Sequence, residues 1–240
     1  MQAIILAAGM GTRLGELTTD LPKALVRVAG RELILRVLDF LDHPAIDERI
    51  VVIGFGADQL ESFLMTKASE VKRVHNPHFT DGSIRSIEAA LPHIREDALV
   101  MNVDHIYPRR LLQRIADCPS GISALCDFDR TLTADDMKVQ LTPEGELRAI
   151  RKTLSPFDGG YIGMTRCDTN SLPHYAKAVR ATRAEEGELA SADWALGTLA
   201  THGVPVHICD ASGIPWLEVD TQEELTRAEA ILASDGDYLR

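Results

Sequence analysis

The first half of the chain alternates short apolar runs with patterns typical of helices. Three runs are almost entirely apolar, as expected of strands covered on both faces, and they lie at Ala3–Ala8, Arg49–Gly54 and Ala98–Asp104. Helices are expected at 33–41, where apolar residues recur every four positions, and at 57–65 and 83–91. This alternation predicts an α/β fold with a mostly parallel sheet and helices on both of its faces.

The second half changes to hairpin and helix patterns. Residues 137–141 alternate polar and apolar side chains, 142–145 read as a turn, and 147–151 can return as the partner strand of a small antiparallel insertion. Further helices are expected at 172–183, 192–202 and 222–234, with a short strand at 216–219. Because no repeat and no Pro/Gly-rich linker interrupts the pattern, we expect a single domain over 1–240.

Composition and charge narrow the function classes. The 240 residues include 25 Lys and Arg against 36 Asp and Glu, which gives a formal net charge of −11. Such an acidic chain is unsuited to non-specific binding of nucleic acid or anionic membrane, which requires concentrated positive charge. One bound nucleotide needs only a few local cations and remains compatible with this charge.

Targeting signals and cysteines indicate a compartment. No apolar stretch approaches the roughly 20 residues of a membrane span. The run Ala3–Ala8 is too short for a signal peptide and has no basic flank. The four cysteines, none spaced as CxxC, are expected to be free thiols in a reducing compartment, and they are Cys118, Cys126, Cys167 and Cys209. We therefore expect a cytoplasmic protein.

A glycine-rich loop follows the first expected strand. Gly9 and Gly11 allow backbone N–H groups to approach a phosphate, and Arg13 and Lys23 add positive charge beside them. The loop is not a P-loop, because Lys23 lies twelve residues after Gly11, and it lacks the dinucleotide fingerprint because Leu14 replaces its last glycine. On these residues alone, a flexible loop with solvated cations is an equal alternative.

The whole string is more specific than its glycines. LAAGMGTRL at 6–14, followed by LPKALVRVAG at 21–30, resembles the signature of nucleotidyltransferases that make activated sugars and activated alcohols. The resemblance implies a Rossmann-like sheet in which about 1–125 bind the nucleotide, 126–215 bind the acceptor, and 216–240 supply a returning strand and helix. It implies that Arg13 and Lys23 are catalytic. It also implies a nucleotide-binding backbone made of Leu6, Ala7, Ala8, Gly9 and Gly11.

Two distant aspartates complete the catalytic set that the resemblance implies. Asp104 follows the strand at 98–103 and Asp220 follows the strand at 216–219, and the family coordinates its catalytic Mg²⁺ with aspartates at these two places. Two carboxylates with phosphate oxygens and water suit Mg²⁺. Taken singly, Asp220 is better explained as a helix cap and Asp104 as a loop cap. His105 is expected to pack beside the site and not to bind the ion.

Later strings resemble the CTP:inositol-1-phosphate cytidylyltransferases, a branch near the phosphocholine and 2-aminoethylphosphonate enzymes. These strings are VDHIY at 103–107, ADDMKV at 134–139, FDGGYIG at 157–163 and WLEVDTQEE at 216–224. The branch implies residues around the base and ribose at Asn76, Gly82, Ser83 and Ser86, although Ser83 could equally cap a helix. It places Asp158 at polar groups of the phosphorylated acceptor. We also expect Lys138 and Lys152 to neutralise the acceptor phosphate and Tyr161 to line the acceptor site, although an exposed hairpin lysine is more commonly solvated.

The sequence thus predicts a Mg²⁺-dependent cytidylyltransferase that joins CTP to a phosphorylated alcohol, with inositol 1-phosphate favoured and a homodimer left open. Phosphocholine or 2-aminoethylphosphonate are alternative acceptors, and another NTP with a sugar 1-phosphate is an alternative pair. A glycosyltransferase of related fold would not need Arg13 and Lys23 on a glycine loop. A non-catalytic nucleotide sensor would be expected to lack the lysine and the two aspartates, all of which are present.

Overall fold

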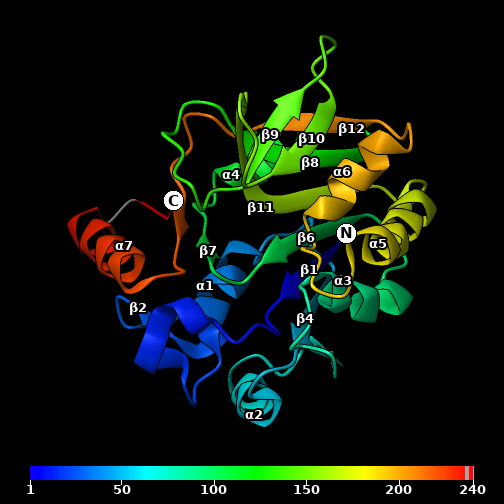
Figure 1. Ribbon diagram of the computed structural model, residues 1–240. Helices are drawn as coiled ribbons and strands as arrows, with labels where there is room; N and C mark the ends of the chain where they lie inside the picture. The colour runs from blue at the N-terminus through cyan, green and yellow to red at the C-terminus, as the bar shows by residue number, and fades with distance from the viewer. Residues whose placement is uncertain (236–237, 240) are drawn as a thin grey trace.

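A twisted sheet forms the centre of the molecule (Figure 1). The computed structural model describes residues 1–235 and 238–239, and within them nine strands join in one sheet. These strands are β1 (Gln2–Leu6), β4 (Glu48–Ile53), β5 (Lys72–His75), β6 (Ala98–Asn102), β8 (Ile122–Asp127), β9 (Lys138–Leu141), β10 (Leu147–Arg151), β11 (Gly159–Cys167) and β12 (Val206–Asp210). Shorter strands lie outside it at β2 (Arg27–Val28), β3 (Arg31–Glu32), β7 (His105–Ile106) and β13 (Leu217–Glu218).

The N-terminal part of the sheet is parallel, as the apolar runs predict. β1 pairs in parallel with β4 on one side and with β6 on the other, and β5 pairs in parallel with β4. Leu6 at the end of β1 lies opposite Asn102 at the end of β6. The loops after these two strands, which carry the glycines and Asp104, therefore leave the sheet at the same edge.

The C-terminal part of the sheet is organised around β11, which the sequence pattern does not reveal. β11 runs antiparallel to β6, β8 and β9, and so joins the parallel half to the hairpin of β9 and β10. That hairpin is the small antiparallel insertion predicted at 137–151. β12 adds in parallel to β8. The observed fold is thus Rossmann-like, with a mostly parallel central sheet and an antiparallel extension.

Helices cover both faces of the sheet, and alternate residues of β1 show why. Ala3 and Ile5 point into one core, with α1 (Leu33–Phe40), α2 (Ala57–Lys67) and α4 (Leu111–Ala116). Ile4 and Leu6 point into the other, with α3 (Ile84–Ala90), α5 (Leu172–Glu186) and α6 (Trp194–Thr201). A strand with both of its faces buried must be apolar on every residue, which accounts for the uninterrupted apolar run.

The last helix, α7 (Gln222–Ser234), packs in a separate cluster beside the sheet (Figure 1). Its start is fixed by a capping box: the Thr221 side chain accepts from the backbone N–H of Glu224, whose carboxylate accepts from the Thr221 backbone. Leu225 and Ala228 bury its inner face against Leu217 and Val219. The cap holds Asp220 at the junction between β13 and α7. Among the described residues, none of the helices combines the length and apolarity needed to cross a bilayer.

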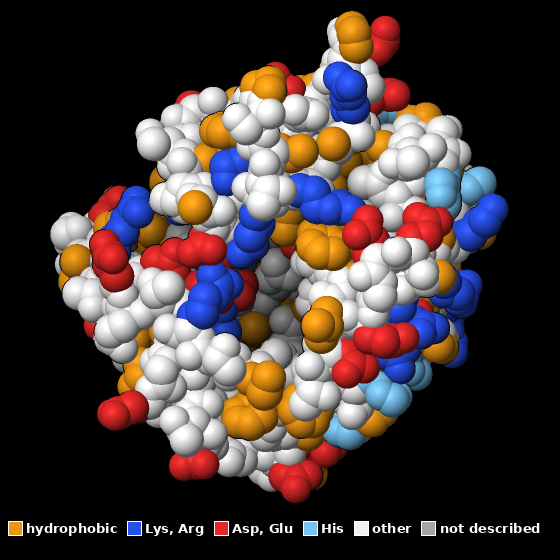
Figure 2. Space-filling view, in the orientation of Figure 1, with side chains coloured by type: hydrophobic (Ala, Val, Ile, Leu, Met, Phe, Trp, Pro, Cys, Tyr) orange, Lys and Arg blue, Asp and Glu red, His pale blue; other side chains and the backbone are white. Residues whose placement is uncertain are grey.

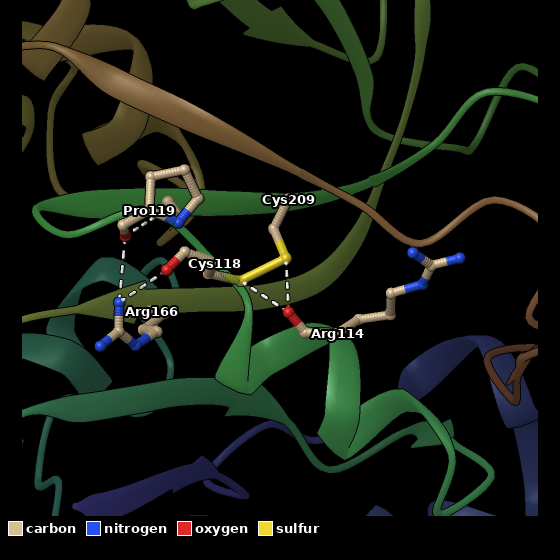
Figure 3. The surroundings of a disulfide bond; sticks show 6 residues. Arg114, Cys118, Pro119, Arg166 and Cys209 are labelled. Carbon is tan, nitrogen blue, oxygen red and sulfur yellow. Dashed lines mark hydrogen bonds between the residues drawn. A yellow bond between two sulfur atoms is a disulfide. The ribbon is translucent and has the colours of Figure 1, made fainter.

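The structure corrects the expectation that all four cysteines are free. Cys118, after α4, and Cys209, on β12, form a disulfide with their Cα atoms 5.3 Å apart (Figure 3). Both sulfurs lie against the backbone carbonyl of Arg114. The two residues are 91 positions apart in the chain, so their spacing in the sequence carries no sign of the pairing. Cys126 and Cys167 are free and buried, as expected.

Candidate functional site

A cavity of about 310 Å³ opens at the edge of the sheet where β1 and β6 end. Figure 2 shows this hollow near the centre of the face, with basic and acidic side chains gathered on its rim. Its walls come from several places in the chain: the glycine loop with Lys23, the loop before α3, the end of β6 and the residues after it, the segment leading into β9, Lys152 after β10, strand β11, and the start of α6. β13 and Asp220 close its remaining side.

The glycine loop takes its shape from Gly11 and the residue it packs against. Gly11 has φ 67° and ψ 32°, a left-handed conformation that strains other residues. A Cβ there would lie 2.8 Å from the Cβ of Lys23. Thr18 Oγ1 donates to the Gly11 carbonyl at 2.8 Å and ties the loop to the short 3₁₀-helix η1 (Thr12–Thr18). Gly9 lines the cavity, with open space where its Cβ would be.

Lys23 lies where three of the predicted catalytic residues meet. Its Nζ donates to Asp104 Oδ2 at 2.6 Å and also to Asp220 Oδ1. Arg13 donates to the other oxygen of Asp220. Residues from the glycine loop, the end of β6 and the end of β13 therefore converge on one point, although Asp220 is 197 positions from Lys23. One cation reaches both carboxylates at once.

Burial and charge together set the ionisation of this group. Lys23 is 6% exposed, and burial opposes its charge, but the carboxylates of Asp104 and Asp220 outweigh burial and raise its pKa. Burial would raise the pKa of Asp104, yet Lys23 and His105 outweigh it and hold that pKa well below its usual value. The lysine is thus charged and Asp104 ionised at neutral pH.

His105 and Glu218 lie beside the two aspartates and extend this cluster of titratable side chains. His105 Nδ1 lies 2.7 Å from Asp104 Oδ1, and its ring stacks on Trp216 with centroids 5.3 Å apart. Burial raises the pKa of Glu218 to about 7, with Asp104 and Asp220 adding to the shift and His105 opposing it. Ligand atoms of Asp104, His105 and Glu218 lie within 4.8 Å of one another.

This donor set fits a divalent cation. Carboxylate oxygens of Asp104 and Asp220 reach one shared position, at present taken by the ammonium of Lys23, and Glu218 adds a third carboxylate nearby. Oxygen ligands of this kind suit Mg²⁺ and leave positions for phosphate and water. The sequence analysis predicted only Asp104 and Asp220 as metal ligands. The His105 ring nitrogen contacts the Asp104 carboxylate, and His105 also belongs to the group of possible ligands; that it packs beside the ion without binding it stays a prediction.

The predicted nucleotide-binding residues divide into two groups. Those that line the cavity are Leu6, Ala8, Gly9, Gly82, Ser83 and Ser86. Ala7 instead packs in the core, Gly11 packs on Lys23, and Asn76 is 1% exposed behind the wall. Asn76 Nδ2 donates to Ser86 Oγ at 3.1 Å, so Asn76 can act on a nucleotide only by positioning Ser86.

The predicted acceptor-binding residues also divide, and two of them lie elsewhere. Lys152 and Tyr161 line the cavity. Lys138 does not, because its buried ammonium donates to three backbone carbonyls, at Thr133 (2.6 Å), Lys152 (2.9 Å) and Asp136 (3.3 Å). Asp158 is on the exposed hairpin side, where it accepts from the backbone N–H of Leu141 at 2.7 Å. Both residues stabilise the insertion in place of facing a ligand.

The sequence analysis assigned no role to two acidic residues that line the cavity. Glu218 lies on β13, two residues before Asp220, and Asp193 lies at the start of α6. Burial raises the pKa of Asp193 to about 6; the Ser191 hydroxyl opposes the shift and Asp104 adds to it. Glu218 lies within the quoted string WLEVDTQEE and Asp193 lies in none of the quoted strings, and neither was expected to reach the cavity. Only the fold brings them to the cavity.

Comparison with known proteins decides the family. Residues 3–134, which include the glycine loop and Asp104, match the MobA-like NTP transferase domain. The chain belongs to this family. The chain is 31% identical over 234 residues to a "Bifunctional IPC transferase and DIPP synthase" of Rubrobacter xylanophilus, covering 96% of this chain and 51% of the relative. With the protein of the same name from Archaeoglobus fulgidus it shares 30% identity over 235 residues, 98% of this chain and 44% of that one.

A solved structure supports the same fold. The inositol-1-phosphate CTP transferase of T. maritima superposes with a TM-score of 0.82 at 20% identity, over 97% of this chain and 94% of that chain. This nucleotidyltransferase chain spans about half the length of the curated relatives it matches.

Proposed function

We propose that the protein is a Mg²⁺-dependent cytidylyltransferase that converts CTP and inositol 1-phosphate into CDP-inositol and pyrophosphate. The observation that carries the proposal is the convergence of Lys23, Asp104 and Asp220 in a cavity floored by a glycine loop. The activities in the names of similar proteins supply the substrates, since they include an IPC transferase and an inositol-1-phosphate CTP transferase.

The proposed reaction is an in-line displacement at the α-phosphorus of CTP. An acceptor phosphate oxygen forms the new P–O bond, the bond to the β-phosphate oxygen breaks, and its electron pair leaves with pyrophosphate. The attacking oxygen is anionic near neutral pH, so the reaction requires no general base. Catalysis then consists of positioning two anions and neutralising the charge between them.

The residues of the cavity suit these two tasks. Gly9 leaves room for a phosphate against the backbone, and Arg13, which is only half-buried, can turn towards the leaving phosphates. Lys23 is held charged in a nearly dry position, where a preorganised cation stabilises developing negative charge most strongly. The carboxylates of Asp104 and Asp220, which hold the Lys23 ammonium in this structure, are the residues we propose as Mg²⁺ ligands; the bound ion would take the place of the ammonium, which would then be free to contact phosphate.

Magnesium is the metal we propose, because the donors are oxygens and the substrates are phosphates. When bound, it would supply charge neutralisation for the triphosphate. Nucleotidyltransferases of this family generally use a divalent metal.

The composition of the cavity favours a polyol over choline as the acceptor. Recognition of a trimethylammonium group calls for several aromatic faces. Among the described residues of the cavity wall, Phe79 and Tyr161 are the phenylalanine and tyrosine side chains. Phe79 lies in the loop before α3, which we assign to the nucleotide, so only Tyr161 of the two is left for the acceptor. Polar side chains dominate the rest of the wall and suit hydroxyl groups.

The experiment that tests the function measures pyrophosphate release with Mg²⁺, each of four NTPs, and a panel of inositol 1-phosphate, phosphocholine, 2-aminoethylphosphonate and glucose 1-phosphate. The proposal expects the highest kcat/KM for CTP with inositol 1-phosphate. Another acceptor with CTP would correct the substrate, and another NTP would correct the nucleotide. Absence of pyrophosphate release with every pair would overturn the proposed activity.

A further inference from the structure

The segment Glu188–Asp193 is fastened to the loop that precedes α3. Three hydrogen bonds join them: Gly82 N to Glu188 O at 2.8 Å, Ile84 N to Ala190 O at 3.2 Å, and Ala192 N to Ser83 Oγ at 2.8 Å. A side chain at Gly82 would overlap the carbonyl of Ala190. The segment is therefore held against the wall of the cavity, and the residue at its end, Asp193, has a fixed position.

Asp193 occupies a helix N-cap position but its side chain does not cap the helix. It stands at the N-cap position of α6, where aspartate side chains usually accept from the backbone of the first turn. The Asp193 side chain makes no such bond. Its carboxylate lines the cavity and accepts from Ser191 Oγ at 3.2 Å. A carboxylate has two oxygens with about four lone-pair sites, so most of its capacity to accept is unused.

The surroundings of Asp193 mix donors and acceptors. Ser191, Lys152 and Asp193 all line the cavity, and the Lys152 charge favours the ionised form of Asp193. Lys152 Nζ lies 3.9 Å from Asp135, which is exposed. A cationic acceptor would meet the Lys152 ammonium here as well as the carboxylates of Asp135 and Asp193. A neutral polyol could donate to Asp193 and accept from Lys152.

We propose that Asp193 is a specificity-determining residue that accepts hydrogen bonds from the hydroxyl groups of a polyol phosphate, an inference that rests on the proposed function. The acceptor phosphate lies at the Lys23 end of the cavity, where the charges that neutralise it converge. Its carbon skeleton extends towards Asp193. Ser83 positions Asp193 through Ala192, so one loop that faces the nucleotide also fixes the residue that reads the acceptor.

The test compares kinetics of the wild type, Asp193→Ala and Asp193→Asn at saturating CTP and Mg²⁺. Inositol 1-phosphate and propyl phosphate, which has no free hydroxyl on its carbon chain, are the paired acceptors. The exposed Asp58→Asn on α2 is the matched control for loss of one aspartate charge. Circular dichroism and thermal unfolding establish that each variant is folded.

For Asp193→Ala we expect kcat/KM with inositol 1-phosphate to fall by about 10- to 100-fold, as for loss of hydrogen bonds to a charged group, mostly through the KM of the acceptor. With propyl phosphate the value changes less than twofold, and so does the KM of CTP. Asp193→Asn keeps one carbonyl acceptor, so its kcat/KM with inositol 1-phosphate should lie between the values of the wild type and Asp193→Ala. If Asp193 had only a structural role, the substitution would lower kcat/KM for both acceptors by the same factor.

Two results would overturn this inference while leaving cytidylyl transfer intact: an unchanged ratio of kcat/KM between the two acceptors in folded Asp193→Ala, or a wild-type preference for 2-aminoethylphosphonate over inositol 1-phosphate. A wild-type protein that releases no pyrophosphate from CTP with any acceptor would overturn the proposed function, and this inference with it.

Discussion

Lys23 connects the glycine loop to both aspartates. The carbons of its side chain pack against Gly11, which has no Cβ to interfere, and its ammonium lies between Asp104 and Asp220. The resemblance of the sequence to nucleotidyltransferases identified these residues singly, from a short motif and two strand ends. Their common position could not be derived from spacing, because Asp220 is brought back by the last strand and helix of the chain.

Removal of the lysine charge tests this connection. For Lys23→Ala we expect kcat to fall by roughly 10²–10³, as for loss of a preorganised charge donor, while circular dichroism remains that of the wild type. Initial rates of pyrophosphate release at saturating CTP measure the effect. Lys23→Arg keeps the charge and should retain more activity than Lys23→Ala. A higher KM with unchanged kcat would make Lys23 a binding residue only.

Asp193 makes the stability of the fold depend on pH. Burial raises its pKa to about 6 from 3.8, so the unfolded chain loses this proton first as pH rises. The free energy of unfolding therefore falls between about pH 4 and pH 6, by on the order of 3 kcal/mol in all. Urea unfolding of the wild type and Asp193→Asn at pH 4, 5, 6 and 7 isolates this contribution.

In that comparison, Asp193→Asn should gain stability relative to the wild type as pH rises through this window, and the difference should level off above pH 7. Matched curves for the exposed control Asp58→Asn should show no such gain. A constant difference between wild type and Asp193→Asn at every pH would contradict the raised pKa.

At the scale of elements, α7 and its cap hold one of the two aspartates. Thr221 and Glu224 form the capping box, and the Glu224 carboxylate also accepts from the Asp220 backbone N–H at 2.8 Å. The sequence predicted this helix at 222–234, and the structure confirms these bounds. Thr221 and Glu224 interact only with their own neighbours in sequence, so a helix start of this kind can be predicted without knowledge of the fold.

Thr221→Ala tests the cap. We expect the free energy of unfolding to fall by about 1 kcal/mol, since an N-terminal N–H of α7 loses its partner. Chemical denaturation measures the loss. Thr226→Ala, in the exposed middle of the same helix, is the control and should cost much less. Equal losses for the two variants would show that the capping box adds no particular stability.

The strand β11 shows where the sequence pattern is insufficient. Its segment Gly159–Cys167 contains three glycines, which weaken the signal of a strand. The reasons for these glycines lie far away in the sequence: a side chain at Gly159 would meet Phe128, one at Gly160 would meet Leu132, and one at Gly163 would meet His105. Such constraints come from packing between distant segments. Local patterns predict β1, β4, β6 and the hairpin, but not β11, which joins them, nor β5, β8 and β12.

At the scale of the whole molecule, the disulfide between Cys118 and Cys209 closes a loop across the C-terminal half of the sheet (Figure 3). It joins the end of α4 to β12, which pairs with β8 and is followed by the segment leading to Trp216 and β13. Because the two cysteines are 91 positions apart, the cross-link closes a long loop and removes much conformational entropy from the unfolded chain.

Reduction therefore has a defined expected effect. Loss of the cross-link in Cys118→Ser with Cys209→Ser should lower the free energy of unfolding by up to about 4–5 kcal/mol, the limit set by loop-closure entropy. Thermal unfolding with and without a thiol reductant measures it. The Tm of the double variant should no longer change on addition of reductant. The control Cys126→Ala, which removes a buried free thiol and keeps the disulfide, should respond to reductant as the wild type does. A wild-type protein whose Tm is unaffected by complete reduction would contradict this expectation.

The most direct test of the central claim is a ³¹P NMR time course of the wild-type protein with CTP, Mg²⁺ and inositol 1-phosphate. The account predicts that CTP resonances give way to one pyrophosphate and one pyrophosphate diester per turnover, only when metal and acceptor are both present, and not with Asp104→Asn or Asp220→Asn. Release of orthophosphate, or equal turnover by either aspartate variant, would contradict it.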